Sequence, residues 1–463
     1  MEEQTSIFKT GENDSPTKAV LVSAVFQNDD RHGAEVSLSE LEQLLKTAGG
    51  EALAKMVQYK TQPDPRTYIG SGKVKELREL CINNGATLVV FDTELSPSQI
   101  RNIENELNGD EKDGKDGKDE DGKDNETEKK DENDDEESIV VIDRSMLILD
   151  IFALHAKTGE GKLQVELALL KYSVPRLAGK GLKLSRLGGG IGTRGPGETK
   201  LETDRRHLKR RMDALEAELA VLEKNRTVQR KQRDKSGLYK IAIAGYTNAG
   251  KSTLLNYLTD AGILAENKLF ATLDPTTRKY TLPDGNEILL TDTVGFIRNL
   301  PHHLIRAFKS TLEEVCFSDA VLIVIDATEP ECDAQLSVTE NLLEELGATG
   351  KPILYVYNKC DLEAKEMPKI RFSKGEDNLF FISAKTGEGT ERLIDRITSL
   401  VNDGKREEIF IFPHSEQGKT DILYKNAVVL DVQYTEEFVI VRAICDGKIS
   451  GMLKKYSERK KDQ

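Results

Sequence analysis

The sequence predicts a multidomain protein of the α/β class. Its 463 residues are too many for one ordinary hydrophobic core, so three or more domains are expected. Short apolar runs alternate with amphipathic stretches along much of the chain, which is the pattern of strands alternating with helices. One glycine-rich turn, between the apolar run 238–244 and a helix that begins at Lys251, marks a strand–turn–helix unit in the middle of the chain.

The first domain is predicted over residues 19–175 as an α/β unit. Its strands are expected from apolar runs and its helices from amphipathic spacing. The strands fall at 19–26, 87–91 and 139–142, and the helices at 38–48 and 71–84. The stretch 146–155 is again apolar, so the domain continues past it.

An acidic insert, 109–138, interrupts this domain. It holds sixteen Asp and Glu residues against six Lys, a net charge of −10 out of −14 for the whole chain. Its repeated Gly-Lys-Asp triplets contain no apolar side chain and cannot offset the entropy of ordering. We expect a disordered loop here, and a chain that is otherwise close to neutral.

A linker of two parts is predicted over 176–235. Residues 171–211 hold twelve Lys and Arg against three acidic residues, a net of +9, and the Gly/Arg-rich run 171–197 does not suit a packed helix or strand. Beyond it, apolar residues recur at heptad spacing, at Leu201, Leu208, Met212, Leu215, Leu219 and Leu222. This spacing predicts a helical hairpin or a short intramolecular coiled coil. A homodimeric coiled coil is the alternative, but the seam is short, so we expect a monomer.

The rest of the chain divides into a central domain, 236–402, and a small C-terminal α/β domain, 403–463. In the C-terminal domain, strands are predicted at 428–434 and 438–444. It contains no residue pattern that indicates chemistry, so a packing or docking role is expected.

The turn in the central domain has the composition of a phosphate-binding loop. Its residues are Gly245, Tyr246, Thr247, Asn248, Ala249, Gly250, Lys251 and Ser252. The glycines let backbone N–H groups point inward at phosphate oxygens, and the following helix adds its positive end. Lys251 is expected to reach the β- and γ-phosphates, and the Ser252 hydroxyl to bind Mg²⁺. The pattern predicts a P-loop domain, with a mixed, mostly parallel sheet and helices on both faces.

A second phosphate-end motif follows the predicted strand 287–291. It consists of Asp292, Thr293, Val294 and Gly295. A carboxylate at this strand end can hold Mg²⁺ through water, and the Gly295 N–H can bond the γ-phosphate.

The choice of base is predicted from two segments that follow apolar strands at 353–357 and 379–382. The first is Asn358, Lys359, Cys360 and Asp361, and the second is Ser383, Ala384 and Lys385. Guanine offers two adjacent N–H donors that the Asp361 carboxylate matches, whereas adenine offers no such pair, so GTP is preferred over ATP. The second segment supplies a backbone N–H for guanine O6.

A threonine between the two phosphate motifs is expected to complete the magnesium shell and to sense the γ-phosphate. The segment runs Phe270, Ala271, Thr272, Leu273, Asp274, Pro275, Thr276 and Thr277. Spacing alone leaves three candidates: Thr272, Thr276 and Thr277.

With these motifs in order, the chain resembles the HflX family of translation-factor-class GTPases. Further similar motifs lie outside the central domain: PDPRTYIGSGKV at 63–74, FDTELSPSQ at 91–99, LQVEL at 163–167 and GGIGTRGPGE at 189–198. The resemblance covers most of residues 35–402. It departs from the family at Leu187, where a Gln is usual before the glycine run, and in the acidic insert, which is additional.

The resemblance implies a GTPase in which Thr272 is the magnesium-binding threonine, and in which Lys251, Thr272 and Gly295 act on the γ-phosphate. It further implies association with the large ribosomal subunit and a role in ribosome splitting, rescue, protein synthesis or ribosome maturation. The basic segment 171–211 independently suits contact with RNA phosphates. Its alternative interpretation is a flexible basic linker.

Two residues bear on catalysis. Phe296 stands where many signalling GTPases place a Gln that orients water, so slow intrinsic hydrolysis, raised by the ribosome, is expected. Asn248 occupies a loop position at which related GTPases hold K⁺, so a potassium requirement is a hypothesis; simple loop shape is the alternative.

Two other functions stay open: a GTP-regulated RNA-binding scaffold, and a GTPase of the tRNA-modification or membrane-associated type. The second would need a C-terminal catalytic Cys or an amphipathic anchor, and neither is found in the sequence. No apolar run approaches the length of a membrane span, and no leader is evident, so the cytoplasm is expected. Five scattered cysteines indicate neither a disulfide framework nor a zinc site.

Overall fold

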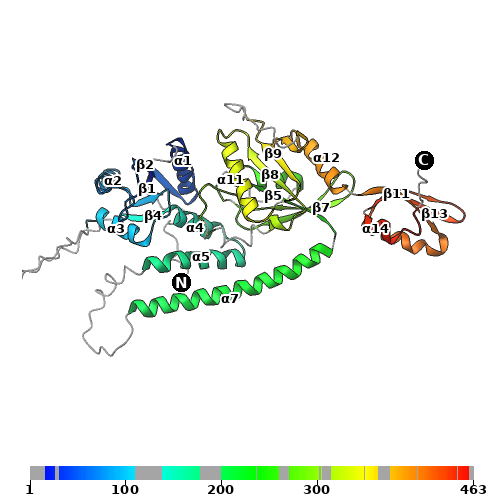
Figure 1. The fold of residues 1–463 in the computed structure, drawn as a ribbon, viewed down its shortest axis with the longest axis horizontal. Helices are drawn as coiled ribbons and strands as arrows, with labels where there is room; N and C mark the ends of the chain where they lie inside the picture. Colours follow the sequence, from blue (N-terminus) through cyan, green and yellow to red (C-terminus); the bar gives the residue numbers. More distant parts are fainter. Residues whose placement is uncertain are drawn as a thin grey trace, which may run out of the picture. The chain divides into compact units, whose positions relative to one another are not determined.

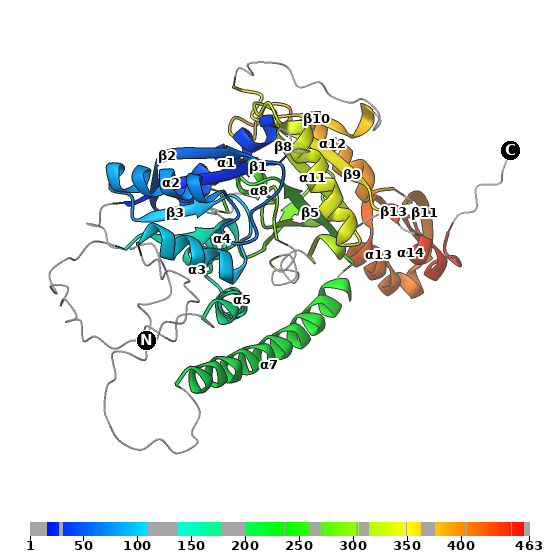
Figure 2. The same ribbon diagram turned by 60° about the vertical axis from the view of Figure 1, so that its left-hand side comes forward.

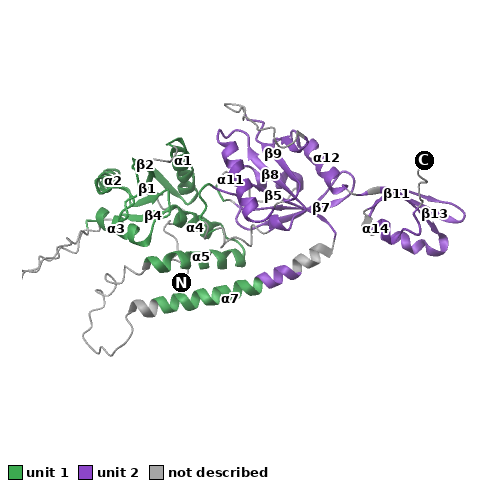
Figure 3. Cartoon of the chain, in the orientation of Figure 1, with its two compact units in different colours: residues 1–222, 268–270, 298–309 green, residues 223–267, 271–297, 310–463 purple. Residues whose placement is uncertain are grey.

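The computed structural model describes residues 16–26, 31–109, 138–177, 200–235, 237–259, 269–270, 272–301, 304, 314–348, 350–362, 376–403, 405–445 and 447–457. Most of the predicted acidic loop and the Gly/Arg-rich run 178–199 lie outside these residues. The chain forms two compact units (Figure 3). The first comprises 1–222, 268–270 and 298–309, and the second 223–267, 271–297 and 310–463. None of the described helices is long and apolar enough to cross a lipid bilayer.

The first unit is built on a four-stranded parallel sheet (Figure 1). Its strands are β1 (Thr17–Val25), β2 (Gly50–Tyr59), β3 (Leu88–Phe91) and β4 (Val140–Asp143), in the order β2-β1-β3-β4. The strands predicted at 19–26, 87–91 and 139–142 are confirmed within a few residues. The edge strand β2 was not predicted, because its side chains are mostly half-buried and do not alternate cleanly.

Helices connect these strands in a doubly wound arrangement (Figure 2). The connecting helices are α1 (Arg31–Thr47), α2 (Ser71–Asn84) and α3 (Pro97–Leu107), and α4 (Arg144–His155) follows the last strand. Helix α1 packs against α4, and α2 packs against α3, so that each pair covers one face of the sheet. The apolar stretch 146–155 is therefore a helix, and its N-cap is the Asp143 carboxylate, which accepts from the Met146 N–H at 2.9 Å.

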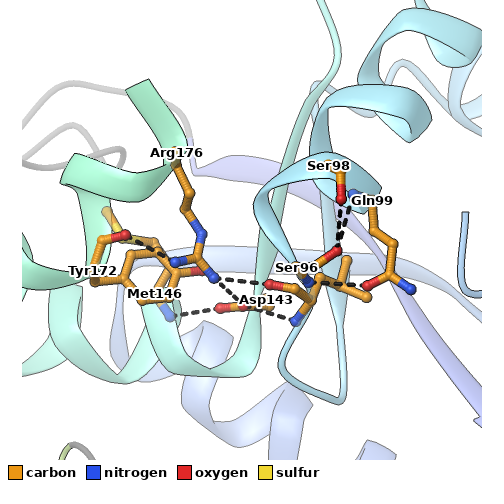
Figure 4. A network of polar contacts seen from close by, with 8 residues as sticks. Ser96, Ser98, Gln99, Asp143, Met146, Tyr172 and Arg176 are labelled. Carbon is orange, nitrogen blue, oxygen red and sulfur yellow. Dashed lines mark hydrogen bonds and ion pairs between the residues drawn. The ribbon is translucent and has the colours of Figure 1, made fainter. Parts of the chain in front are cut away.

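A polar network ties the end of helix α5 (Gly159–Leu177) to the sheet edge (Figure 4). The Arg176 guanidinium donates to the Leu95 carbonyl at 2.8 Å and to the Asp143 carboxylate at 3.3 Å. It also lies 3.3 Å above the centre of the Tyr172 ring. The prediction that 171–197 excludes a packed helix is thus wrong for its first residues: the helix continues through Pro175 to Leu177 because these contacts hold its last turn.

The linker is a helical hairpin formed by α5 and the long helix α7 (Lys200–Lys235). Arg211 donates two hydrogen bonds to Glu166, at 2.7 and 2.8 Å, and Lys171 pairs with Glu216 at 2.7 Å. Leu215, from the heptad seam, is fully buried. Two ion pairs therefore join α7 to α5, and Leu215 is the seam residue that is fully buried among those described, whereas Leu208, Met212, Leu219 and Leu222 are half-buried.

The second unit contains a six-stranded sheet in the order β10-β9-β8-β5-β7-β6. The strands are β5 (Tyr239–Gly245), β6 (Thr276–Thr281), β7 (Glu287–Asp292), β8 (Ala320–Asp326), β9 (Ile353–Asn358) and β10 (Leu379–Phe381). All pairs are parallel except β6–β7, which confirms the predicted mixed, mostly parallel sheet. Helices α8 (Lys251–Thr259), α11 (Cys332–Glu345) and α12 (Thr390–Val401) connect the strands.

A three-stranded antiparallel sheet, ordered β11-β13-β12, follows at the C-terminus (Figure 1). Its strands are β11 (Arg406–Pro413), β12 (Val428–Tyr434) and β13 (Phe438–Cys445). Helices α13 (Thr420–Asn426) and α14 (Gly447–Met452) complete it, with the short 3₁₀ turn η3 (His414–Lys419); a second such turn, η2 (Glu376–Asn378), precedes β10. Phe410, Phe412, Val441 and Leu423 form its core. The strands predicted at 428–434 and 438–444 are present as β12 and β13, β11 was not predicted, and the described strands of this sheet pair antiparallel.

Candidate functional site

The predicted phosphate loop joins the end of β5 to the start of α8. Gly250 has φ +96°, and a Cβ added there would lie 2.2 Å from the Asn358 Nδ2 atom. Asn248 also has a positive φ, of 61°. The loop is therefore a tight curl that only glycine permits at position 250, and the helix that begins at Lys251 directs its free N–H groups at it.

Lys251 lies inside this curl. Its side chain is buried, and the ammonium donates to the Tyr246 carbonyl of its own loop at 2.7 Å. Burial lowers the pKa of Lys251 to about 8, against the opposing effect of the Asp292 carboxylate. A cation held in so little solvent gains from an anionic partner, as a phosphate oxygen would be.

Three oxygen-bearing side chains meet beside the loop. The Ser252 hydroxyl lies 2.9 Å from the Thr272 hydroxyl and 2.6 Å from Asp292 Oδ2. Asp292 is fully buried, which raises its pKa, although Lys251 and the hydroxyls lower it. Its Oδ1 atom has no hydrogen-bond partner among the described residues. Hard oxygen donors around an unpaired carboxylate oxygen fit Mg²⁺, with Ser252 and Thr272 as the side chains that would hold it.

The other two candidate threonines lie elsewhere. Thr276 and Thr277 belong to β6, and the Thr277 hydroxyl pairs with that of Thr291 on β7 at 2.9 Å. Of the three threonines left open by spacing, the structure places Thr272 beside Ser252.

The segment that ends β7 is attached to the phosphate loop through its backbone. Phe296 N–H donates to the Gly245 carbonyl at 3.1 Å, and Thr247 N–H donates to the Phe296 carbonyl at 2.8 Å. A Cβ on Gly295 would come within 2.8 Å of Thr247 and 2.9 Å of Lys251 Nζ. Gly295 therefore sits against the phosphate loop, where its N–H can meet the γ-phosphate. The Phe296 ring is only 1% exposed and has no polar atom with which to orient water.

The predicted guanine segments come together at the carboxyl ends of β9 and β10. Asn358 joins them to the phosphate loop: its Nδ2 donates to the Ala249 carbonyl and its Oδ1 accepts from the Ala384 N–H, both at 2.8 Å. Cys360 N–H donates to the Ile382 carbonyl at 3.1 Å. The Asp361 carboxylate and Lys385 are exposed beside this junction.

Motif spacing did not predict how this junction is fastened. Asn358 was expected as part of the base-recognition motif, but it also holds three segments together. Lys359, with φ 69°, pairs with Asp326 at the end of β8 at 2.6 Å, and Asp326 also accepts from the Thr328 hydroxyl at 2.7 Å. The only advance signal for Asp326 is an acidic residue at the end of an apolar strand, which is too common to be informative.

The remaining residues of the threonine segment have less direct roles. Thr293 and Val294 are buried, and the Thr293 hydroxyl donates to the Ile243 carbonyl at 2.8 Å. Leu273 is buried and Asp274 half-buried. Phe270 belongs to the first unit, where it has φ 55° and packs edge-on against Phe152 at 4.8 Å between ring centres. Ala271 lies outside the described residues.

Comparison with known proteins identifies the family of this chain. Residues 240–359 match the model of a family described as 50S ribosome-binding GTPase, residues 35–111 match GTP-binding GTPase N-terminal, and residues 155–233 match GTP-binding GTPase Middle Region. The chain is 47% identical over 434 residues to GTPase HflX of Lacrimispora saccharolytica, covering 94% of this chain and 95% of the relative. This chain belongs to the HflX family of GTPases.

Two further proteins are similar to this chain. GTPase HflX of Caldanaerobacter subterraneus is 43% identical over 439 residues, covering 95% of this chain and 93% of the relative. A solved GTP-binding protein from Sulfolobus solfataricus, in complex with GDP, is 25% identical, covers 84% of this chain and 99% of its own, and has a TM-score of 0.41. As an HflX-family member, the chain binds and hydrolyses GTP.

Proposed function

We propose that this HflX-family GTPase works in the cytoplasm on the large ribosomal subunit, with a role in ribosome splitting or rescue, protein synthesis or ribosome biogenesis. The observation that carries the proposal is the match of its nucleotide domain, residues 240–359, to a family described as 50S ribosome-binding GTPase. The chain is taken to act as a monomer, because the heptad seam is short and α7 forms ion pairs with α5 of the same chain, Arg211 with Glu166 and Lys171 with Glu216.

Surface charge supports an RNA partner. The first turns of α7 present exposed basic side chains at Arg205, Arg206, Lys209 and Arg210. They belong to the basic segment 171–211, whose net charge is +9. Each contact between such a side chain and a phosphate releases counterions, so binding to the subunit should weaken as salt increases.

The roles proposed for the nucleotide site follow its geometry. The loop 245–252 wraps the phosphates, and Lys251 leaves the Tyr246 carbonyl to neutralise the β- and γ-phosphates. Mg²⁺, when bound, would neutralise charge on the same phosphates, held by Ser252 and Thr272, with Asp292 behind them. Gly295 N–H contacts the γ-phosphate, and Asp361 with Ala384 N–H selects guanine.

The buried Phe296 ring is the basis for proposing that the ribosome accelerates GTP hydrolysis. Because no amide is present at this position to orient the attacking water, intrinsic hydrolysis is slow, and a group ordered or supplied by the ribosome accelerates it, by about 10³-fold or more in comparable trans-activated systems. The test is GTP hydrolysis by the full chain with and without isolated large subunits, with Lys251→Ala as the blank. Strong stimulation is expected. A low rate that subunits leave unchanged would remove the ribosomal proposal and favour a scaffold or a tRNA-modification-type GTPase.

A potassium ion is the second proposed cofactor. Asn248 lies in the curl of the loop with a left-handed backbone, at a position where related GTPases hold K⁺ near the bridge between the β- and γ-phosphates. Hydrolysis in potassium is expected to exceed hydrolysis in sodium, and Asn248→Ala should abolish the difference. Equal rates in both salts would eliminate this cofactor.

A further inference from the structure

The hydroxyl of Thr247 stands apart from those of the other buried threonines. Its Oγ1 atom is buried and has no hydrogen-bond partner among the described residues. In the part of the chain that the structure describes, six other buried threonines each bond their hydroxyl to a neighbour: Thr67, Thr291, Thr293, Thr339, Thr390 and Thr420. An unpaired buried hydroxyl costs roughly 1–3 kcal/mol, so its retention calls for a partner that the chain does not supply.

The residues around Thr247 indicate which part of the nucleotide could supply a hydrogen-bond partner for its hydroxyl. A Cβ added to Gly295 would lie 2.8 Å from both Cα and Cγ2 of Thr247 and 2.9 Å from Lys251 Nζ. The backbone N–H of Thr247 is already used, since it donates to the Phe296 carbonyl. Thr247 therefore adjoins the residues expected at the γ-phosphate: its methyl carbon Cγ2 faces Gly295, and the hydroxyl on the same Cβ is the hydrogen-bond donor of this residue that is left without a partner among the described residues.

We propose that Thr247 is a further catalytic residue of GTP hydrolysis, whose hydroxyl donates a hydrogen bond to an oxygen of the transferring γ-phosphoryl group. In the reaction, the water oxygen bonds to Pγ while the bond from Pγ to the β–γ bridging oxygen breaks. The electron pair leaves on GDP, and the proton of the water passes to the inorganic phosphate. Negative charge on the equatorial oxygens must be stabilised throughout, and a preorganised donor in a buried site does so effectively.

The chemistry of the site favours a phosphoryl oxygen over water as the acceptor. A hydrogen bond to a charged oxygen contributes about 1.5–3 kcal/mol, more than one to a neutral partner. The nearby Phe296 ring offers no polar atom, so Thr247 is the unpaired neutral donor beside Gly295 among the described residues. This inference rests on the GTP site proposed above and is independent of the ribosome.

Matched variants of the full chain test it. Thr247→Val keeps the shape and removes the hydroxyl, whereas Thr247→Ser keeps the hydroxyl and removes the methyl group. Single-turnover hydrolysis of saturating GTP, without ribosomes, should fall about 10-fold or more in the valine variant and stay within about 3-fold in the serine variant. Affinity for GDP·AlF₄⁻ should fall with the rate, while affinity for GDP stays within about 2-fold.

A stability measurement separates this role from a structural one. If the hydroxyl is unpaired in the nucleotide-free protein, Thr247→Val should raise the melting temperature while it lowers turnover. A valine variant that turns over at the wild-type rate would overturn the proposal, as would a serine variant that loses as much as valine. A loss of GDP affinity equal to the loss of rate would also overturn it, because the residue would then shape the loop rather than contact the γ-phosphoryl group. None of these outcomes depends on ribosome binding, so the ribosomal proposal stands or fails separately.

Discussion

We propose that Asp361, an exposed carboxylate at the end of the segment that follows β9, selects the base. Asp361→Asn replaces an acceptor of two guanine N–H groups with a side chain that can also donate to a carbonyl. GTP affinity should fall roughly 10- to 100-fold, the value of a charge-assisted hydrogen bond, and affinity for xanthosine triphosphate should rise. Titration with both nucleotides measures the change. Equal losses for both would mean that Asp361 does not contact the base.

A different result is expected for Asn358, because this side chain holds the phosphate loop and the two guanine segments together rather than selecting the base. Asn358→Ala would leave the Ala249 carbonyl and the Ala384 N–H, both bonded at 2.8 Å, without partners. Affinity for GTP, GDP and xanthosine nucleotides should fall together, and the unit should lose about 1–3 kcal/mol of stability. Asn358→Asp is the matched control: it keeps the acceptor for Ala384 but sets an oxygen against the Ala249 carbonyl. A GTP-selective loss would contradict this interpretation.

Asp361 and Asn358 illustrate which features of the site could be predicted from the sequence and which could not. Asp361 and Lys251 were assigned their roles from the chemical requirements of the nucleotide, which limit the residue types and their order along the chain; these roles stay predictions. The contact between Asn358 and Ala249 depends on which strand ends lie side by side in the sheet. A local sequence motif does not determine the order of the strands, so this contact could not be predicted. Spacing likewise left three threonines open, and only the pairing of β6 with β7 takes Thr277 away from Ser252.

At the scale of single elements, the start of α4 is fixed by an ion cluster in the first unit. Arg144 is 2% exposed; it donates to Asp92 at 2.7 Å and to the Arg298 carbonyl at 3.1 Å, and it also pairs with Glu40. Burial raises the pKa of Asp92, while Arg144 lowers it. Removing the cation would therefore leave the largely buried side chains of Asp92 and Glu40 without their counter-charge.

Arg144→Met should accordingly destabilise the first unit by about 3–5 kcal/mol. Without Arg144 the folded-state pKa of Asp92 rises further above its unfolded value. The variant should thus be least stable at neutral pH and recover as the pH falls into the carboxyl range. Hydrogen exchange of β3 and β4 across pH reports this locally. Arg211→Met, which removes an exposed pair with Glu166, is the control and should cost less than about 1 kcal/mol. Similar losses in both variants would contradict the burial argument.

Helices and strands were predicted correctly where several local sequence signals agree, such as apolar periodicity and flanking glycines. Residues 71–84 were predicted and form α2, which Gly70 precedes and the left-handed Gly85 ends. Helix α1 begins at Arg31 rather than at 38, because its first turns are largely exposed and lack apolar periodicity. The edge strand β11 was missed because its first residues, Arg406, Glu407 and Glu408, are charged, and such residues are typical of edges that avoid unwanted pairing.

At the scale of the whole molecule, the acidic insert enters and leaves the first unit at one point. Asn108, after α3, donates to the Ile139 carbonyl at 3.0 Å and accepts from the Ile139 N–H at 2.8 Å. These two bonds close the ends of the insert beside β4 without using any of its own side chains. The unit should consequently fold whether the connection is long or short.

Replacing 111–136 by a short Gly/Ser linker should therefore leave intrinsic GTP hydrolysis within about 2-fold of wild type. The melting temperature should be equal or slightly higher, since each halving of a flexible loop saves only about 0.6 kcal/mol of closure entropy. Binding to large subunits should strengthen, most at low salt, because most of a net charge of −10 no longer repels ribosomal RNA. Sedimentation with large subunits across a salt series measures this.

A variant of unchanged length with its acidic and basic residues replaced by Ser and Gly isolates charge: it should bind like the deletion. If it binds like wild type instead, loop length rather than charge governs access to the subunit, and the repulsion argument fails.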